Sequence, residues 1–68
     1  RRSILIIELK KDDSPENAIK QIKDREYMNP YLNRDEDILL IGVGYDSNDP
    51  AKTHRCVIEE YEKNSGKD

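Results

Sequence analysis

Glu8 and Lys10, an acid and a base two positions apart, directly follow the apolar run at residues 3–7. In an extended strand, side chains at positions i and i+2 project from the same face, so this carboxylate and this ammonium would lie side by side. A carboxylate binds hard cations such as Mg²⁺, and an ammonium attracts phosphate. The pair therefore has the chemistry of a metal and phosphate site, and equally that of a salt bridge on one strand face.

The composition limits what kind of protein this can be. With 68 residues and 34% hydrophobic content, the chain is one small domain at most and has little core of its own. Its 40% charged content predicts a solvated surface, and no stretch approaches the roughly 18 apolar residues of a membrane span. A single cysteine, Cys56, cannot close a disulfide within the chain, so we expect a reducing compartment and a cytoplasmic protein.

The net charge of −3 is unevenly distributed along the chain. Residues 1–36 hold eight Lys/Arg and eight Asp/Glu, whereas residues 37–68 hold four and seven. Because no broad basic patch exists, charge-driven binding of nucleic acid by the whole surface is not indicated. Any contact with phosphate would have to be local.

The pattern of apolar and polar residues predicts an α/β fold of order β-α-β-β. Residues 3–10 read as a strand that is apolar on both faces and that we expect to be buried on both sides. Residues 37–45 read as a second strand that is apolar on both faces, and residues 54–61 as a third, antiparallel to the second. Ser14, Pro15 and Glu16 form a helix start, and we expect the helix to run over residues 15–27. Residues 28–33 read as an irregular connection that packs Tyr31 and Leu32 inward, and residues 62–68 as a flexible tail.

The predicted helix has one narrow apolar stripe, made by Ala18, Ile19 and Ile22. Gln21 and Arg25 lie one turn apart on a flank of this stripe, a position from which they could face the end of the first strand. A single helix covers one face of the sheet, so the other face needs a cover. We expect either missing N-terminal elements, because the chain begins at Arg1 without a Met, or self-association of the isolated piece.

The order of these segments resembles the PD-(D/E)XK nuclease superfamily. The likeness rests on residues 4–10, the acidic loop, residues 18–23 with Tyr27 nearby, and residues 40–45, and it spans roughly residues 3–61. It is greatest to the nuclease-like domain that often follows an AAA-ATPase-like domain in bacterial proteins. The resemblance implies that residues 1–61 are the C-terminal portion of a restriction-endonuclease-like domain, a mixed sheet with one helix on one face.

The resemblance also implies roles for individual residues in the hydrolysis of DNA. Glu8 and the carbonyl of Leu9 would bind Mg²⁺ or Mn²⁺, and Lys10 would hold the attacking water or the scissile phosphate. Gln21 matches the helix glutamine of the family, which orients the lysine or contacts the phosphate backbone. Arg25, a nucleic-acid contact inferred from helix geometry alone, would lie beside Gln21.

One residue of the family pattern is missing from this chain. The first acidic ligand of the superfamily lies on a strand that precedes the glutamate, and that position falls before Arg1. Asp12 and Asp13 follow the motif, so we do not assign them this role. We therefore expect the 68-residue piece to be inactive alone and its parent to cut DNA. Two alternatives stay open: a catalytically inactive nuclease fold used as an interaction module, in an effector or toxin, and a small structural domain in which Glu8 and Lys10 form only a salt bridge.

Other apparent motifs fail on inspection. Gly42 and Gly44 follow a strand, but the third glycine of a dinucleotide loop is missing, so we expect them to permit close packing or a bulge near the strand end instead. His54 and Cys56 share one strand face, yet two ligands make no zinc site, and a surface histidine beside a buried thiol is the expectation.

Overall fold

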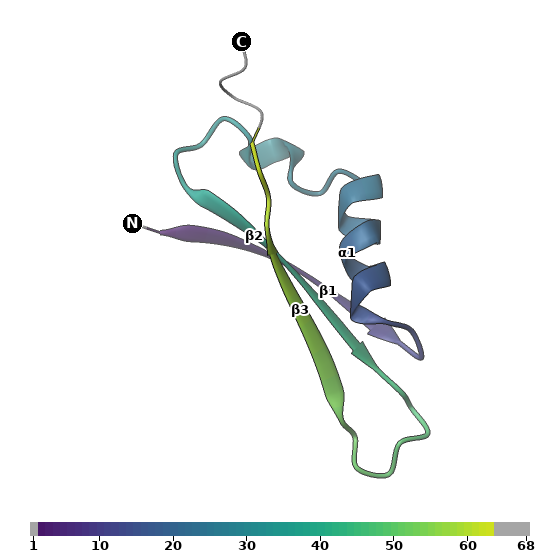
Figure 1. The fold of residues 1–68 in the computed structure, drawn as a ribbon. Helices are drawn as coiled ribbons and strands as arrows, with labels where there is room; N and C mark the ends of the chain where they lie inside the picture. Colours follow the sequence, from purple (N-terminus) through teal and green to yellow (C-terminus); the bar gives the residue numbers. More distant parts are fainter. Residues whose placement is uncertain (1, 64–68) are drawn as a thin grey trace.

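A computed structural model of the chain describes residues 2–63 and shows a small α/β domain (Figure 1). A three-stranded mixed sheet carries one α-helix, followed by a short 3₁₀ helix in the connection to the second strand. The elements are β1 (Ser3–Lys11), α1 (Pro15–Asp24), the 3₁₀ helix (Asn29–Tyr31), β2 (Asp37–Tyr45) and β3 (His54–Glu60). This confirms the predicted β-α-β-β order, with strand bounds that differ from the prediction by one residue.

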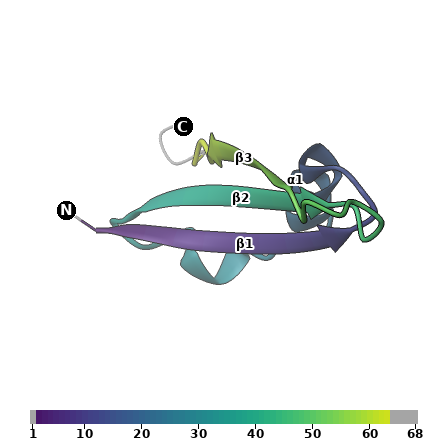
Figure 2. The same cartoon turned by 90° about the horizontal axis from the view of Figure 1, so that it is seen from below.

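The strands lie in the order β1, β2, β3, and Figure 2 shows them side by side. β1 and β2 are parallel, with Glu8 opposite Gly42 and Lys10 opposite Gly44, whereas β3 is antiparallel to β2. A parallel pair requires a crossover connection, and α1 supplies it. The crossover brings the helix over the end of β1 that carries the Glu8 and Lys10 pair.

Helix α1 starts as the sequence predicts and ends three residues earlier. The hydroxyl of Ser14 accepts a hydrogen bond from the backbone N–H of Asn17 at 3.0 Å, and Pro15 occupies the first turn. After Asp24, Glu26 adopts a left-handed φ of 57°, and the N–H of Tyr27 donates to the carbonyl of Ile22 at 3.2 Å. This is a Schellman-type end, which usually contains glycine, so the sequence did not reveal it.

The core lies between α1 and one face of the sheet. The fully buried large side chains are Ile22, Met28, Ile38 and Leu40, and Ala18 and Ile19 are buried beside them. Tyr31 and Leu32 pack against this cluster, as the sequence predicts, together with Ile4, Ile6, Val57 and Tyr61.

The prediction that β1 is buried on both sides is wrong for this chain. Leu5, Ile7 and Leu9 are 53%, 60% and 57% exposed, and Ile58 on β3 is 63% exposed. The cause is the single helix, which covers only the face of the sheet that carries Ile4, Ile6 and their neighbours. Cys56 is also exposed, which corrects the expectation of a buried thiol, because it lies on the uncovered face.

Two glycines of β2 allow the start of α1 to rest directly on the sheet. A Cβ atom on Gly42 would lie 2.2 Å from the carbonyl oxygen of Pro15, and one on Gly44 would lie 2.4 Å from that of Asp13. Both distances are well inside van der Waals contact and involve backbone atoms, so any side chain would push the helix away. This confirms that Gly42 and Gly44 serve close packing.

Residues 64–68, most of the predicted flexible tail, lie outside the described residues. Within residues 2–63, no helix is long and apolar enough to cross a membrane.

Gly42→Ala should destabilise the domain by about 1–3 kcal/mol, the usual cost of forcing an extra methyl group into a packed interface. The reason is that the new Cβ would have to displace the backbone of Pro15. Urea unfolding followed by far-UV circular dichroism measures the change in the free energy of unfolding. Glu62→Ala, an exposed control, should stay within about 0.5 kcal/mol of wild type. Equal stabilities for Gly42→Ala and wild type would contradict the close approach.

Candidate functional site

The side-chain amide of Gln21 links the two residues that open the sequence analysis. The Lys10 ammonium donates a hydrogen bond to Gln21 Oε1, and Gln21 Nε2 donates to Glu8 Oε2 at 2.9 Å. Both contacts are partly buried and join residues 11 and 13 positions apart in the chain. The structure therefore brings together the three residues predicted to be catalytic, while their roles stay a prediction.

Strand alternation and the β2 glycines together create this arrangement. Glu8 and Lys10 project from the covered face of β1, on the same side as Ile4 and Ile6. Their neighbours on β2 are Gly42 and Gly44, which carry no side chains over the sheet. The start of α1 can therefore lie directly on the sheet, and Gln21, on the flank of the buried stripe, reaches Glu8 and Lys10.

The charges of the two partners fix the orientation of the Gln21 amide. An ammonium can only donate a hydrogen bond and a carboxylate can only accept one, so Oε1 must face Lys10 and Nε2 must face Glu8. A reversed amide would place N–H groups against the ammonium and oxygen against the carboxylate. The amide therefore holds an anion and a cation at set positions, an arrangement that can present a carboxylate to a metal ion and an ammonium to a phosphate.

The other two predicted site residues take peripheral positions. The side chain of Leu9 points to the uncovered face, so only its backbone lies between Glu8 and Lys10. Arg25 caps the helix through its own N–H, which donates to the Gln21 carbonyl at 2.9 Å. The exposed Arg25 and the half-buried Gln21 line an open hollow of about 270 Å³, whose other lining residues are Asp13, Asn17, Lys20 and Asp24.

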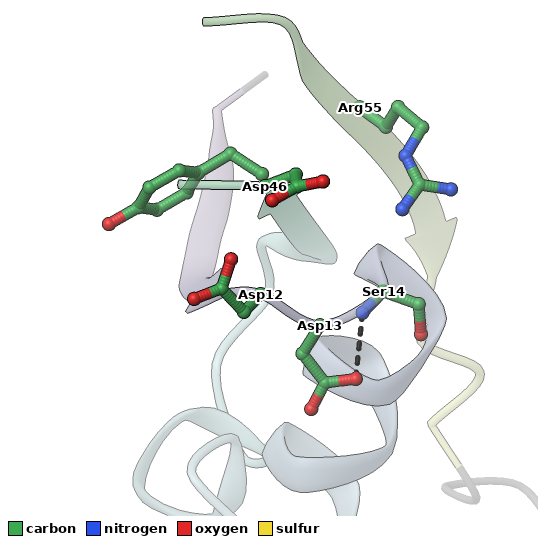
Figure 3. A pocket seen from close by; sticks show the side chains of 6 residues that line it. Asp12, Asp13, Ser14, Asp46 and Arg55 are labelled. Carbon is green, nitrogen blue, oxygen red and sulfur yellow. Dashed lines mark hydrogen bonds between the residues drawn. The ribbon is translucent and has the colours of Figure 1, made fainter. Parts of the chain in front are cut away.

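A second hollow of about 380 Å³ lies at the same end of the sheet, and the sequence analysis did not foresee it (Figure 3). Its lining residues are Asp12, Asp13, Ser14, Tyr45, Asp46 and Arg55. The turns at residues 11–14 and 46–49 meet here because β1 and β2 are parallel and end at the same edge of the sheet. Their meeting depends on the register of the two strands. Arg55 lies on β3, two residues before Val57, and its side chain lines the hollow (Figure 3).

Two of the three aspartates that line this hollow, Asp12 and Asp13, hold the loops in place through hydrogen bonds. Asp12, at a left-handed φ of 58°, accepts hydrogen bonds from the backbone N–H of Ser47 at 2.7 Å and from its hydroxyl at 2.9 Å. Asp13 accepts from the side-chain amide of Asn17 and from the N–H of Ser14, both at 2.7 Å. These bonds favour the ionised carboxylates and lower the pKa of both groups.

The oxygen donors near Glu8 suit a hard divalent cation but are few. Within residues 2–63, no group of three or more His, Cys, Asp or Glu side chains could hold a metal ion. Mg²⁺ is commonly bound through one or two carboxylates and keeps several waters, so Glu8 with a backbone carbonyl fits part of such a site. His54 is engaged elsewhere, since its Nδ1 lies 2.9 Å from the Lys52 carbonyl and its ring stacks on Tyr45.

Comparisons with known proteins leave the family open. No protein-family model matches the chain, and neither the search of curated proteins nor that of solved structures finds a match. The functional argument therefore rests on the residues and their geometry.

Carboxylates in the loops make the stability of the domain depend on pH. Arg34 lies 3.0 Å from Glu36 and lowers the pKa of that carboxyl from 4.5 to about 2. The N–H groups of Ala51 and Thr53 lower the pKa of Asp49 in the same way. In each case the folded state favours the charged form more than the unfolded state does.

The free energy of unfolding should fall as the pH is lowered from about 4.5 to about 2, because the unfolded chain takes up protons first. The stabilisation from these groups is fully present above the unfolded pKa values and is lost as the pH passes the folded ones. Urea unfolding at a series of pH values measures the slope. Glu36→Gln removes a group whose folded pKa is about 2 and should flatten the slope; an unchanged profile in that variant would contradict the Arg34 contact as its source.

Proposed function

We propose that this domain is the C-terminal portion of a PD-(D/E)XK-like, restriction-endonuclease-like domain whose full-length parent hydrolyses DNA phosphodiester bonds with Mg²⁺ or Mn²⁺. The observation that supports it is the Gln21 amide bonded to both Glu8 and Lys10. A salt bridge without function would need only the acid and the base. Here a third residue, Gln21 of the crossover helix, bonds to both charges and itself lines an open hollow.

Each residue has a distinct role in this proposal. The Glu8 carboxylate and the Leu9 carbonyl would hold the cation, which, when bound, neutralises developing phosphate charge and lowers the pKa of a water. The Lys10 ammonium would bind the scissile phosphate or the water through its charge. Gln21 positions both groups, and Arg25 would contact the DNA backbone near its end of the hollow.

The domain alone should be inactive, because one carboxylate is a weak anchor for Mg²⁺. The second acidic ligand would come from residues that precede Arg1 in the parent. DNA contact would also depend on the parent, since the net charge of this chain is −3. The charges available here can act locally, at the end of β1 and on α1.

A catalytically inactive nuclease fold that binds other proteins is the second candidate. Two observations favour it: the lack of a three-residue metal cluster within residues 2–63, and the apolar face of the sheet that α1 leaves open. The two functions differ in whether Glu8 takes up a divalent cation.

Mn²⁺ should broaden a small set of NMR signals in the 68-residue chain. Binding at Glu8 predicts selective loss of the amide signals of Leu9 and Lys10 and of the side-chain amide of Gln21, since these lie beside the carboxylate. Glu8→Gln should abolish the selective effect, whereas Glu16→Gln, in the exposed first turn of α1, should leave it intact. Broadening spread evenly over exposed carboxylates, in wild type and Glu8→Gln alike, would favour the inactive module.

Cleavage of DNA by the full-length parent with Mg²⁺ should fall by about 10²-fold or more in Lys10→Met, the scale of losing one charge-stabilising contact in a transition state. Lys11→Met is the matched control, because this neighbouring lysine projects from the opposite face of β1. It should retain near wild-type turnover. If the two variants cleave at the same rate, Lys10 has no catalytic role.

A further inference from the structure

The uncovered face of the sheet carries a continuous apolar surface bounded by charge. Residues that pair across the strands share a face, so the side chains on this side form rows across β1, β2 and β3. The two central rows are wholly apolar or weakly polar. They consist of Ile7, Ile41 and Ile58, and of Leu9, Val43 and Cys56.

The rows that flank this centre differ in charge. On one side lie Leu5 and Leu39 with Glu60, and on the other lie Tyr45 with Lys11 and His54. Within β3, Glu60 and His54 are six residues apart, about 20 Å in an extended strand, so they cannot pair within one chain. One end of the face is therefore acidic and the other basic.

We propose that this face binds a second copy of the chain, with the strands of the two copies antiparallel, so that Glu60 of each copy faces His54 of the other. The two copies are related by a two-fold axis that runs perpendicular to the strands, midway between the two central rows. This axis places β3 of one copy over β3 of the other. The row of Ile7 then meets the row of Leu9, which buries the apolar centre on both sides. Each charged end meets the opposite end of the other copy.

The charge pattern distinguishes this orientation from its alternative. With parallel strands, β1 would lie over β3, so Lys11 would meet His54 and Glu60 would meet Leu5. That arrangement places the Glu60 carboxylate on a leucine, which costs free energy, and leaves His54 beside Lys11 with no carboxylate to face. In the antiparallel arrangement Lys11 lies over Leu5, where its aliphatic stem can cover apolar surface.

The orientation of the His54 ring is fixed within each copy before association. Its Nδ1 lies 2.9 Å from the Lys52 carbonyl, and the ring stacks on Tyr45 with centroids 5.0 Å apart. Because the Lys52 carbonyl can only accept, Nδ1 carries the proton, and Nε2 can donate to Glu60 of the second copy only when the ring is protonated. Fixing the ring in advance lowers the entropy lost on association.

The size of the face predicts a weak dimer. Two strands of nine residues and one of seven, about 4.8 Å apart, give a face of at most roughly 30 by 14 Å, or about 400 Å² per copy. Two such faces bury about 800 Å² in projection, below the range of standard stable interfaces. When two twisted sheets pack face to face, their strand directions commonly differ by about −30°, and the proposed dimer can adopt this packing.

Sedimentation equilibrium on the 68-residue chain, from tens of micromolar to about 1 mM, tests the proposal. The mass should rise from 8.0 kDa toward twice that value. Ile7→Lys and Ile58→Lys should each weaken the association by at least tenfold, with far-UV circular dichroism to confirm the fold. Glu16→Lys, which adds the same charge on α1, should have little effect.

The charge swap tests the orientation. Glu60→Lys and His54→Glu should each weaken the dimer several-fold, and the double variant should recover affinity to within about threefold of wild type. A chain that stays monomeric at 1 mM would overturn the proposal, whether or not it binds a different protein. So would a dimer that Ile7→Lys leaves intact, because that result would indicate pairing through the edge of β1. A double variant that binds no more tightly than the single variants would overturn the proposed orientation.

Discussion

The close approach of α1 to the two glycines of β2 determines how the helix, the sheet and the candidate site fit together. The backbone of Pro15 and Asp13 occupies the space where side chains of Gly42 and Gly44 would stand. This contact sets how near the helix lies to the sheet, and thus how far Gln21 must reach to meet Glu8 and Lys10. The same glycines flank these two residues in the register, so one pair of missing side chains both docks the helix and opens the site.

Much of the fold could be predicted from the sequence because its signals are local. The cap at Ser14, the proline after it and the apolar stripe of Ala18 and Ile22 define the helix start and its buried face, and all are observed. The helix end was missed because Glu26 takes a left-handed conformation that glycine normally marks. The burial of β1 was overestimated because periodicity reports which faces are apolar, whereas the available helix decides which face is covered.

The candidate site was also predicted only in part from the sequence. Strand alternation predicted that Glu8 and Lys10 share a face, and helix geometry placed Gln21 on a flank that could reach them, so their proximity followed from the pattern. The hollow between Asp12 and Arg55 did not, because it arises where two loops meet through the register of β1 and β2. The nuclease function proposed for the parent rests on this geometry together with the resemblance of the motifs, and the paired charges give it its chemistry.

The most direct test of this account is the environment of the Gln21 side-chain amide. Its protons can be observed by NMR in wild type and in Glu8→Gln. A hydrogen bond to the carboxylate predicts that one proton resonates downfield of a solvent-exposed glutamine and moves upfield in the variant. Two protons at exposed values that do not move in Glu8→Gln would contradict the bridge and, with it, the proposed site.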